Sequence, residues 1–361
     1  CTALTDVNLA AGSKLETIGE KAFYGSGLTS IAIPASVQTI GTYAFDGCAA
    51  LKNVTFGANA QLTTIGLAAF RGTGLTAIAL PTTLAEDGLT LGSSLFQDCT
   101  SLASVKLGDS VTKIDASTFQ GCTALTSITI PASVTSIGKL AFSGSGLTSV
   151  KIPATVVTTG DSWFQDCLAL TEVEFETGCT YIDDHTFDGC VSLRTVKIPD
   201  TMEKIDTYAF RGCTSISTLE IPASVTTVGK LAFGGWTKSQ TIRVKASKII
   251  SQSWRHDLNE GWDGDCEANV IWKWGVKETV YTGDGKSSVE IIFAENKILS
   301  LSIATEEGGE TTGTTVSVTA CTYDATTGVY TVTGDNLKTY TVTVTNGVAT
   351  ITEATDTTTQ A

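Results

Sequence analysis

The chain has 361 residues, 42% of them hydrophobic, and this composition indicates folded rather than disordered structure. Its 37 acidic and 23 basic residues give a formal net charge of -14, so contact with nucleic acid or an anionic membrane would add repulsion, and neither is expected as a partner. No stretch approaches the roughly 20 consecutive apolar residues of a membrane-spanning helix.

Most of the chain repeats. Ten of its thirteen phenylalanines recur at steps of 22 to 26 residues, at Phe23, Phe45, Phe70, Phe96, Phe119, Phe142, Phe164, Phe187, Phe210 and Phe233. All six prolines follow a strand-like segment of the form LTSIxIP, where a residue without an N–H ends the strand. This periodicity predicts a solenoid in which one ring per turn joins an internal aromatic column.

The first repeat is expected to be truncated. Residues 1–9, CTALTDVNL, match residues 122–130, so Cys1 stands in the register of a repeat whose first half is missing. The alternative is that Cys1 is the lipidated first residue of a lipoprotein. We favour truncation, because a lipidated cysteine has no reason to lie in the repeat register.

One unit shows the local pattern clearly. In CTALTSITIPASVTSIGKLAF, which begins at Cys122, the residues Leu125, Ile128 and Ile130 alternate inward as in a strand. The return arm that follows is expected to be irregular or short-helical. Because a unit of about 23 residues cannot bury its apolar side alone, the strands are expected to stack as a parallel sheet over residues 1–245, in about ten to eleven repeats.

The cysteines follow the repeat rather than a metal motif. There are ten, with no paired CxxC. The third position after the repeated phenylalanine holds Cys48, Cys99, Cys122, Cys167, Cys190 and Cys213, and in other repeats Ser26, Thr73 and Ser145. Parallel in-register Cβ atoms lie too far apart for a disulfide, so we expect buried, reduced thiols rather than bridges or zinc ligands.

The outward strand positions define a candidate binding face. They include no aromatic residue, which favours weak or multivalent binding over a single tight pocket. Its charged members are Lys106, Lys151, Glu172, Glu174, Lys197, Glu220 and Arg243. Those at 151, 174, 197, 220 and 243 alternate in sign on consecutive repeats, so neighbours about 5 Å apart are expected to pair. We favour a structural charge ladder, and a ligand site remains the alternative.

One histidine lies in an acidic cluster that could suggest a metal site. His185 lies among Asp183, Asp184 and Asp188 on a return arm. We interpret this segment as a solvated turn, because zinc or iron sites usually gather more than one imidazole or thiolate.

Residues 246–275 are predicted to cap the solenoid. Trp236 replaces the small residue of the cysteine position just before this cap, and bulk comes from Trp254, Trp262, Trp272 and Trp274. The other histidine, His256, also lies here. Possible calcium ligands alternate at Asp257, Asn259, Asp263 and Asp265, but they match no EF-hand spacing, so a cap turn is favoured.

The remainder changes to short alternating runs. About seven of them, between residues 276 and 352, predict a small all-β sandwich or barrel. Turn residues separate them, at 283–285, 295–296, 308–309, 335–336 and 346–347. Residues 353–361, EATDTTTQA, are expected to form a disordered Thr-rich tail.

The units resemble the BspA-like leucine-rich repeats of bacterial surface proteins. The resemblance rests on LTSIAIPASVQTIGTYAFDGC at residues 28–48 and LTSITIPASVTSIGKLAFSGS at residues 125–145, and it covers residues 1 to about 245. The stretches GWTKSQTIRVKA and WRHDLNEGWDGDCEANVIW are also similar to the segment that closes such arrays. The resemblance implies a leucine-rich-repeat solenoid and an adhesin-like protein, extracellular or on the bacterial surface, that binds host matrix proteins, host cells or other bacteria. It supplies no catalytic residues.

We therefore expect a non-catalytic binding protein with no cofactor and no metal, whose partners are host or microbial surface proteins or glycans. The alternative is an architectural spacer of a larger surface protein. A glycan-active enzyme is disfavoured, because no paired carboxylates occur in a recognisable cleft context.

Overall fold

The structure, a computed structural model, describes residues 2–9, 12–81, 89–245, 266–272, 276–281, 287–294, 297–307, 310–324, 327, 329–334, 339–345 and 348–353. The chain forms two compact units. The first contains residues 1–219, 224–240 and 253–269, and the second contains residues 220–223, 241–252 and 270–361. The boundaries predicted at residues 245 and 275 stay predictions. Within the described ranges, no helix has the length and hydropathy that a bilayer crossing requires.

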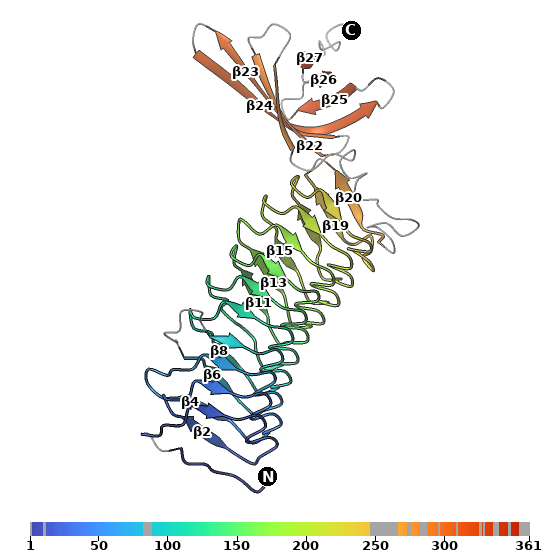
Figure 1. The fold of residues 1–361 in the computed structure, drawn as a ribbon. Helices are drawn as coiled ribbons and strands as arrows, with labels where there is room; N and C mark the ends of the chain where they lie inside the picture. The colour runs from blue at the N-terminus through green and yellow to red at the C-terminus, as the bar shows by residue number, and fades with distance from the viewer. Residues whose placement is uncertain are drawn as a thin grey trace, which may run out of the picture. The chain divides into compact units, whose positions relative to one another are not determined.

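Short parallel strands lie one beneath the next along the first unit (Figure 1). They are β2 (Ser30–Ile33), β4 (Asn53–Phe56), β6 (Ala77–Ala79), β8 (Ser104–Lys106), β11 (Ser149–Ile152), β13 (Glu172–Phe175), β15 (Thr195–Lys197) and β17 (Thr218–Ile221). In-register parallel pairing joins β2 to β4, β6 to β8, and β11 to β13 to β15. Exposed and buried side chains alternate along them, as in β2 and β11, and this confirms the predicted outward positions. We call this surface the presented sheet.

The presented sheet is not continuous, which differs from the expectation. β4 and β6 belong to separate sheets, and residues 125–130, where the sequence predicts a strand, form none. Leu125 and Ile130 are nevertheless buried there. Alternation predicts which side chains face the core, but strand formation also requires that backbone groups line up with a neighbouring rung.

The return arms also contain short parallel strands. They are β1 (Thr17–Ile18), β3 (Thr39–Ile40), β5 (Thr64–Ile65), β7 (Thr90–Leu91), β9 (Lys113–Ile114), β10 (Ser136–Ile137), β12 (Thr158–Thr159), β14 (Tyr181–Ile182), β16 (Lys204–Ile205) and β18 (Thr227–Val228). Turns connect them, and no helix occurs in the described arms. The short-helical part of the prediction is therefore wrong.

Backbone conformation explains why the arms are not helical. In every rung the residue two before the repeated phenylalanine has a φ between 50° and 64°: Lys21, Tyr43, Ala68, Ser94, Ser117, Leu140, Ser162, His185, Tyr208 and Leu231. A left-handed residue costs about 1–2 kcal/mol outside glycine, and it interrupts any right-handed helix. The arm must turn sharply at this point so that the ring re-enters the core.

The ten rings form the predicted internal column. Consecutive ring centroids lie 5.1 to 5.9 Å apart, with interplanar angles of 3° to 20°. The nine rings from Phe45 to Phe233 are fully buried. From Phe23 to Phe210, the backbone N–H of each ring residue also donates to a carbonyl of the next rung, as Phe119 does to Ala141 at 2.7 Å. Side-chain stacking and backbone bonding thus share one register.

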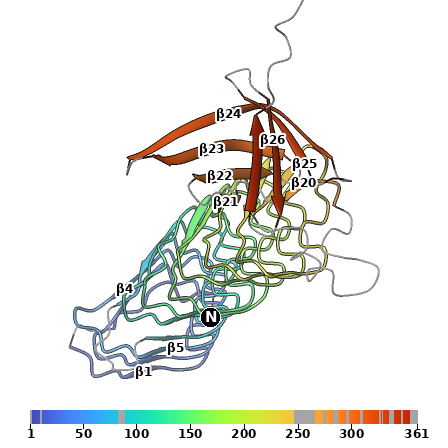
Figure 2. The same cartoon turned by 90° about the horizontal axis from the view of Figure 1, so that it is seen from above.

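The second unit contains a seven-stranded antiparallel barrel, which confirms the predicted all-β module. Its strands are β21 (Val276–Tyr281), β22 (Ser287–Ala294), β23 (Lys297–Glu307), β24 (Glu310–Asp324), β25 (Val329–Gly334), β26 (Thr339–Thr345) and β27 (Val348–Glu353). They pair in chain order, and β22 to β24 run side by side in Figure 2. A single parallel pairing of Tyr281 with Val348 closes the barrel. The same unit includes β19 (Thr241–Val244) and most of β20 (Asn269–Trp272), and the predicted turn residues lie outside the described ranges.

Candidate functional site

The charged side chains of the presented sheet gather on β11, β13 and β15. The strand register places Glu174 between Lys151 and Lys197, and it places Glu172 between Ser149 and Thr195. Successive rungs therefore bring residues 22 to 26 positions apart in sequence into direct contact. The structure confirms that these predicted face residues meet.

Ion pairs join them across the strands. Lys197 Nζ lies 2.8 Å from Glu174 Oε2 and 3.6 Å from Glu172 Oε1. Lys151 Nζ lies 3.8 Å from Glu174 Oε1 and 2.8 Å from Glu176 Oε1. We call these five residues the charge ladder. Both lysine side chains are 58% exposed, so solvent screens the pairs, and they contribute little to stability.

Hydrogen bonds within the ladder favour the charged forms of four of its residues, which are Lys151, Glu174, Glu176 and Lys197. Hydrogen bonding from Lys197 lowers the pKa of Glu174, and hydrogen bonding from Lys151 lowers the pKa of Glu176. The same contacts raise the pKa values of Lys151 and Lys197. The result is an exposed strip of fixed, alternating charge.

Three predicted face residues lie apart from the ladder. Arg243 Nη1 pairs with Glu220 Oε1 at 3.5 Å, so the predicted alternation also yields a contact in β17 and β19. Lys106 faces Ala79 across β6 and β8. Glu176 was missed by the sequence analysis because it follows the strand, where many repeats have proline. Its position beside the Glu172–Glu174 pattern was the available signal.

The cluster around His185 is a structural feature. Asp188 is 5% exposed and accepts two hydrogen bonds from Arg211, from Nε at 2.8 Å and from Nη2 at 2.5 Å. The Arg211 guanidinium lies 4.5 Å from the centroid of the Tyr208 ring, which in turn lies 4.7 Å from the ring of half-buried His185. The predicted solvated turn is therefore wrong for Asp188, because the arginine of the next rung covers it.

The same arrangement occurs a second time. Arg71 donates to buried Asp46 from Nε at 3.0 Å and from Nη2 at 2.7 Å, and it lies over Tyr43. Repetition at distant rungs indicates a device that joins neighbouring arms. Among the described residues, no group of three or more His, Cys, Asp or Glu side chains could hold a metal ion. The possible calcium ligands and His256 lie outside the described ranges.

The cysteine positions form a second internal column. Its six thiols are free and fully buried. Each Sγ donates to the carbonyl of the repeated phenylalanine one rung earlier, as Cys122 does to Phe96 at 3.1 Å. At the end of the column the Trp236 indole N–H makes the same bond to Phe210 at 2.9 Å, and Trp236 is 1% exposed. This confirms the predicted substitution at Trp236, while Cys1, Trp254, Trp262 and Trp274 lie outside the described ranges.

Burial disfavours the thiolate form of five of these six cysteines. Desolvation raises the pKa of Cys99 and that of Cys167 to about 11, and it raises the pKa values of Cys122, Cys190 and Cys213 as well. A nucleophilic or metal-binding cysteine needs the opposite shift, toward the thiolate. The column therefore serves packing and hydrogen bonding.

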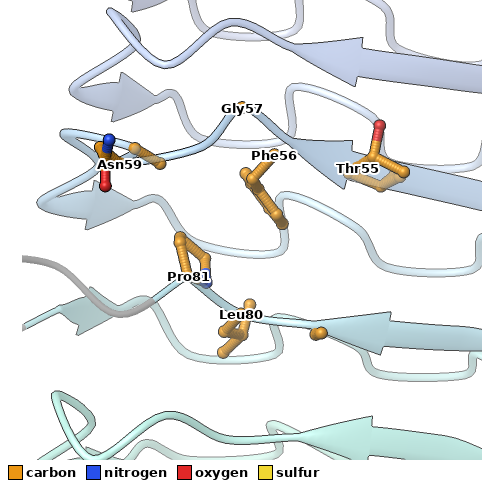
Figure 3. Close-up of a pocket in the computed structure, with 9 residues that line it drawn as sticks. Thr55, Phe56, Gly57, Asn59, Leu80 and Pro81 are labelled. Carbon is orange, nitrogen blue, oxygen red and sulfur yellow. The ribbon is translucent and has the colours of Figure 1, made fainter.

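A hollow of about 500 Å³ opens at the C-terminal ends of β4 and β6 (Figure 3). Its lining includes partly buried Phe56, exposed Thr55 and Asn59, and Leu80 with Pro81 on the next rung. Figure 3 shows the Phe56 ring directed from β4 toward the rung of Leu80, and the lining residues that the structure describes are uncharged. The repeat pattern of the sequence did not predict this hollow.

A smaller recess lies between β12 and β14, which are not paired. Thr159 occupies the inward position that isoleucine holds in Ile137 and Ile205. Trp163 is 1% exposed, and its Nε1 has no hydrogen-bond partner within the described part of the chain. The recess has a volume of about 10 Å³, which is room for about one water molecule and excludes a larger ligand.

Comparison with known proteins identifies the repeats. A family model described as the BspA type leucine-rich repeat region matches six copies, over residues 1–88, 89–216 and 180–254. Curated protein sequences gave no match.

Solved structures of leucine-rich-repeat proteins are similar. The pneumococcal vaccine antigen PcpA is 22% identical, with 65% of this chain and 68% of that chain covered and a TM-score of 0.46. A leucine-rich-repeat protein from Bacteroides ovatus is 24% identical, with coverages of 71% and 87% and a TM-score of 0.38. A leucine-rich cell surface protein from Faecalibacterium prausnitzii is 28% identical, with coverages of 68% and 87% and a TM-score of 0.34. Because the family model spans well over half of the residues, the chain belongs to the BspA-type leucine-rich-repeat family.

Proposed function

We propose that the chain is a non-catalytic, adhesin-like binding protein that uses the presented sheet to contact surface macromolecules. The observation that carries this proposal is the charge ladder, an exposed strip of alternating charge held in register by three paired strands. Parallel pairing fixes the spacing of these charges, so a partner meets a rigid pattern rather than mobile side chains on a loop.

The composition of the face indicates how it binds. No aromatic residue stands among its outward strand positions, and aromatic anchors carry most of the energy of tight interfaces. The ladder's ion pairs are solvent-exposed, so charges on a partner can replace them at small cost. We therefore expect weak individual contacts that gain strength through multivalency on a surface.

Family membership supports the choice of partners and location. The proposal places the protein outside a bacterial cell or on its surface, with host or microbial surface proteins or glycans as partners. One similar protein is described as a vaccine antigen and another as a cell surface protein. The net charge of -14 argues against nucleic acid.

Charge reversal tests the proposal. The double variant Lys151→Glu with Lys197→Glu is compared with Lys113→Glu with Lys139→Glu, two exposed return-arm lysines that give the same change in net charge. Each protein is titrated onto immobilised fibronectin, fibrinogen and a glycan panel. We expect the ladder variant to lose at least tenfold in affinity for a bound partner, while the control variant binds as wild type. Both variants should stay folded, and the ladder variant should melt slightly below wild type because its carboxylates repel one another. Equal losses in the two variants would contradict a specific face.

An architectural spacer is the second candidate. It is favoured by the observation that the ladder charges satisfy one another within the chain. A spacer predicts that wild type binds nothing on the panel. It also predicts that the ladder variant differs from wild type only in a small change of melting temperature.

A further inference from the structure

The hollow of Figure 3 arises where the two longest repeats meet. The steps from Phe45 to Phe70 and from Phe70 to Phe96 are 25 and 26 residues, while the other steps are 22 or 23. β4 lies in the first of these repeats and β6 in the second, and the two strands are not hydrogen-bonded neighbours in one sheet. The hollow therefore coincides with the two longest repeat steps and with the break between the two sheets.

The opening leaves an aromatic ring partly exposed at a strand position that is buried in most other rungs. The strand register matches Phe56 with Ile33, and it matches Phe175 with Ile152 in the same inward position of β13 and β11. Ile33, Ile152 and Phe175 are 2%, 1% and 4% exposed, and Phe175 packs edge-on against Phe187 at 6.1 Å. Phe56 is only partly buried instead and lines the hollow. Part of the Phe56 ring is thus available to a ligand, although its strand position faces the core.

The lining chemistry limits the ligand class. None of the described residues that line the hollow is charged, so these residues offer a charged ligand no counter-charge for the hydration it would lose. A purely apolar ligand would bury the Thr55 hydroxyl, the Asn59 amide and backbone groups at the strand ends without partners. The space therefore fits an uncharged ligand with an apolar face and hydrogen-bonding edges, and its volume lies within the usual range for small-ligand pockets, about 300–1,000 Å³.

The geometry also argues against a peptide strand. The Thr76 N–H donates to the Lys52 carbonyl at 3.4 Å, which ties together the segments that lead into β6 and β4. β4 and β6 are only 4 and 3 residues long, and a peptide adding to a sheet edge needs a longer row of free backbone groups. A compact ring fits both the mixed polar and apolar lining and the short strand edges.

We propose that this hollow is a binding site for a neutral sugar unit. The C–H face of the sugar ring packs on Phe56, since the negative face of an aromatic ring attracts such hydrogens. Its hydroxyl groups exchange hydrogen bonds with Asn59, with Thr55 and with backbone groups of the strand ends. This inference rests on the proposed binding function and adds to it a compact site away from the charge ladder.

Two variants remove the proposed contacts while preserving the fold. Phe56→Leu keeps an aliphatic residue at a position where Leu80 and Leu107 serve in other rungs. Asn59→Gly removes the amide at a φ of 57°, a conformation that glycine adopts freely. Asn53→Ala is the matched control, because Asn53 is an exposed amide on the same strand that does not line the hollow.

Ligand-observed saturation-transfer NMR measures the effect. The probes are methyl glycosides of glucose, galactose, mannose and N-acetylglucosamine, with cellobiose and lactose, against glucuronic acid, N-acetylneuraminic acid and an uncharged capped tetrapeptide. We expect at least one neutral sugar to give a signal that falls at least fivefold in Phe56→Leu and in Asn59→Gly and is unchanged in Asn53→Ala.

Other results would overturn the sugar site. These are no signal from any neutral sugar, a signal that survives both lining variants, or preferential binding of the acids or of the tetrapeptide. The outcome is separable from the test of the proposed function, because the charge-reversal variants leave the hollow intact. If no sugar gives a signal but a partner binds and depends on the charge ladder, the sugar site is contradicted and the proposed function is not.

Discussion

Two buried carboxylates hold neighbouring return arms together. Asp188 and Asp46 are 5% and 4% exposed, and each receives a two-point hydrogen bond from the arginine of the next rung. Planar guanidinium and carboxylate groups match in this geometry, which makes such bonds stronger than neutral ones. The stacked tyrosine under each guanidinium restricts its movement further.

Arg211→Ala should therefore destabilise the solenoid. It leaves the Asp188 carboxylate buried without its donor, at a cost of about 2 kcal/mol in the free energy of unfolding, since Arg211 itself is partly exposed. Arg194→Ala, at an exposed arginine, is the control and should cost less than about 0.5 kcal/mol. Urea titration of the three proteins measures both values. Equal effects from the two variants would show that the Asp188 contact is not structural.

The thiol column makes stability depend on alkaline pH. Burial raises the pKa of Cys99 and of Cys167 to about 11, above the value of about 8.5 for an unfolded thiol. A group whose pKa is raised by folding stabilises the fold fully below its unfolded pKa, and this contribution is lost as the pH rises through the folded value. Wild type should thus lose stability between about pH 8.5 and 11.

The double variant Cys99→Ser with Cys167→Ser isolates this term. Serine already serves at the same position in Ser26 and Ser145, so the fold should tolerate it. Urea titrations under reducing conditions at pH 7.5, 9 and 10.5 should show a shallower alkaline loss for the variant. Parallel pH profiles would indicate that these thiols ionise freely in the folded protein.

At the scale of the rung, the aromatic column is the main packing element. Phe119 is fully buried between Phe96 and Phe142, with centroids at 5.6 and 5.4 Å. Phe119→Ala should cost about 3–5 kcal/mol in the free energy of unfolding, because the rigid neighbours cannot close the cavity. Phe119→Leu should cost markedly less, since it fills most of the same volume. Calorimetry measures both, and a similar small effect of the two variants would contradict close ring packing.

Features that recur in every rung could be predicted from the sequence. A strict period fixes which side chains repeat, so the phenylalanine column, the thiol column and the outward charges could all be identified from spacing. Strand formation at residues 125–130 could not, because it depends on whether two rungs align their backbone groups. The left-handed residues of the arms, such as Leu140 and Leu231, carry side chains with no known preference for that conformation, so sequence suggested a short helix instead.

The charge ladder could be predicted from the sequence more fully than the hollow could. Lys151, Glu174 and Lys197 recur in register, and their pairing follows from parallel stacking. Phe56 occupies an ordinary core position, and only the unequal repeat lengths around it signal that packing fails there. Glu176 stands where most rungs have proline, and Trp163 stands where most have alanine or threonine. Both depart from the repeat, so periodicity assigned them no role.

At the scale of the whole molecule, the stability of a solenoid resides in the interfaces between neighbouring rungs. The seven-stranded barrel of the second unit has its own antiparallel register and its own buried residues, including Ile298, Val332 and Val342. The function proposed for the first unit requires that its rungs stay stacked, because the spacing of the ladder charges is set by the rung repeat. The proposed function therefore requires a continuous stack of rungs.

Amide hydrogen exchange of the intact protein measures whether the rungs form this continuous stack. From Phe45 to Phe210, the N–H of every repeated phenylalanine donates to a carbonyl of the next rung. We predict uniformly slow exchange at these amides, with faster exchange only toward the end of the array at Phe23, where fewer neighbours restrain the rung. An internal phenylalanine amide that exchanges as fast as an exposed loop, between protected neighbours, would contradict a continuous stack and the rigid face that depends on it.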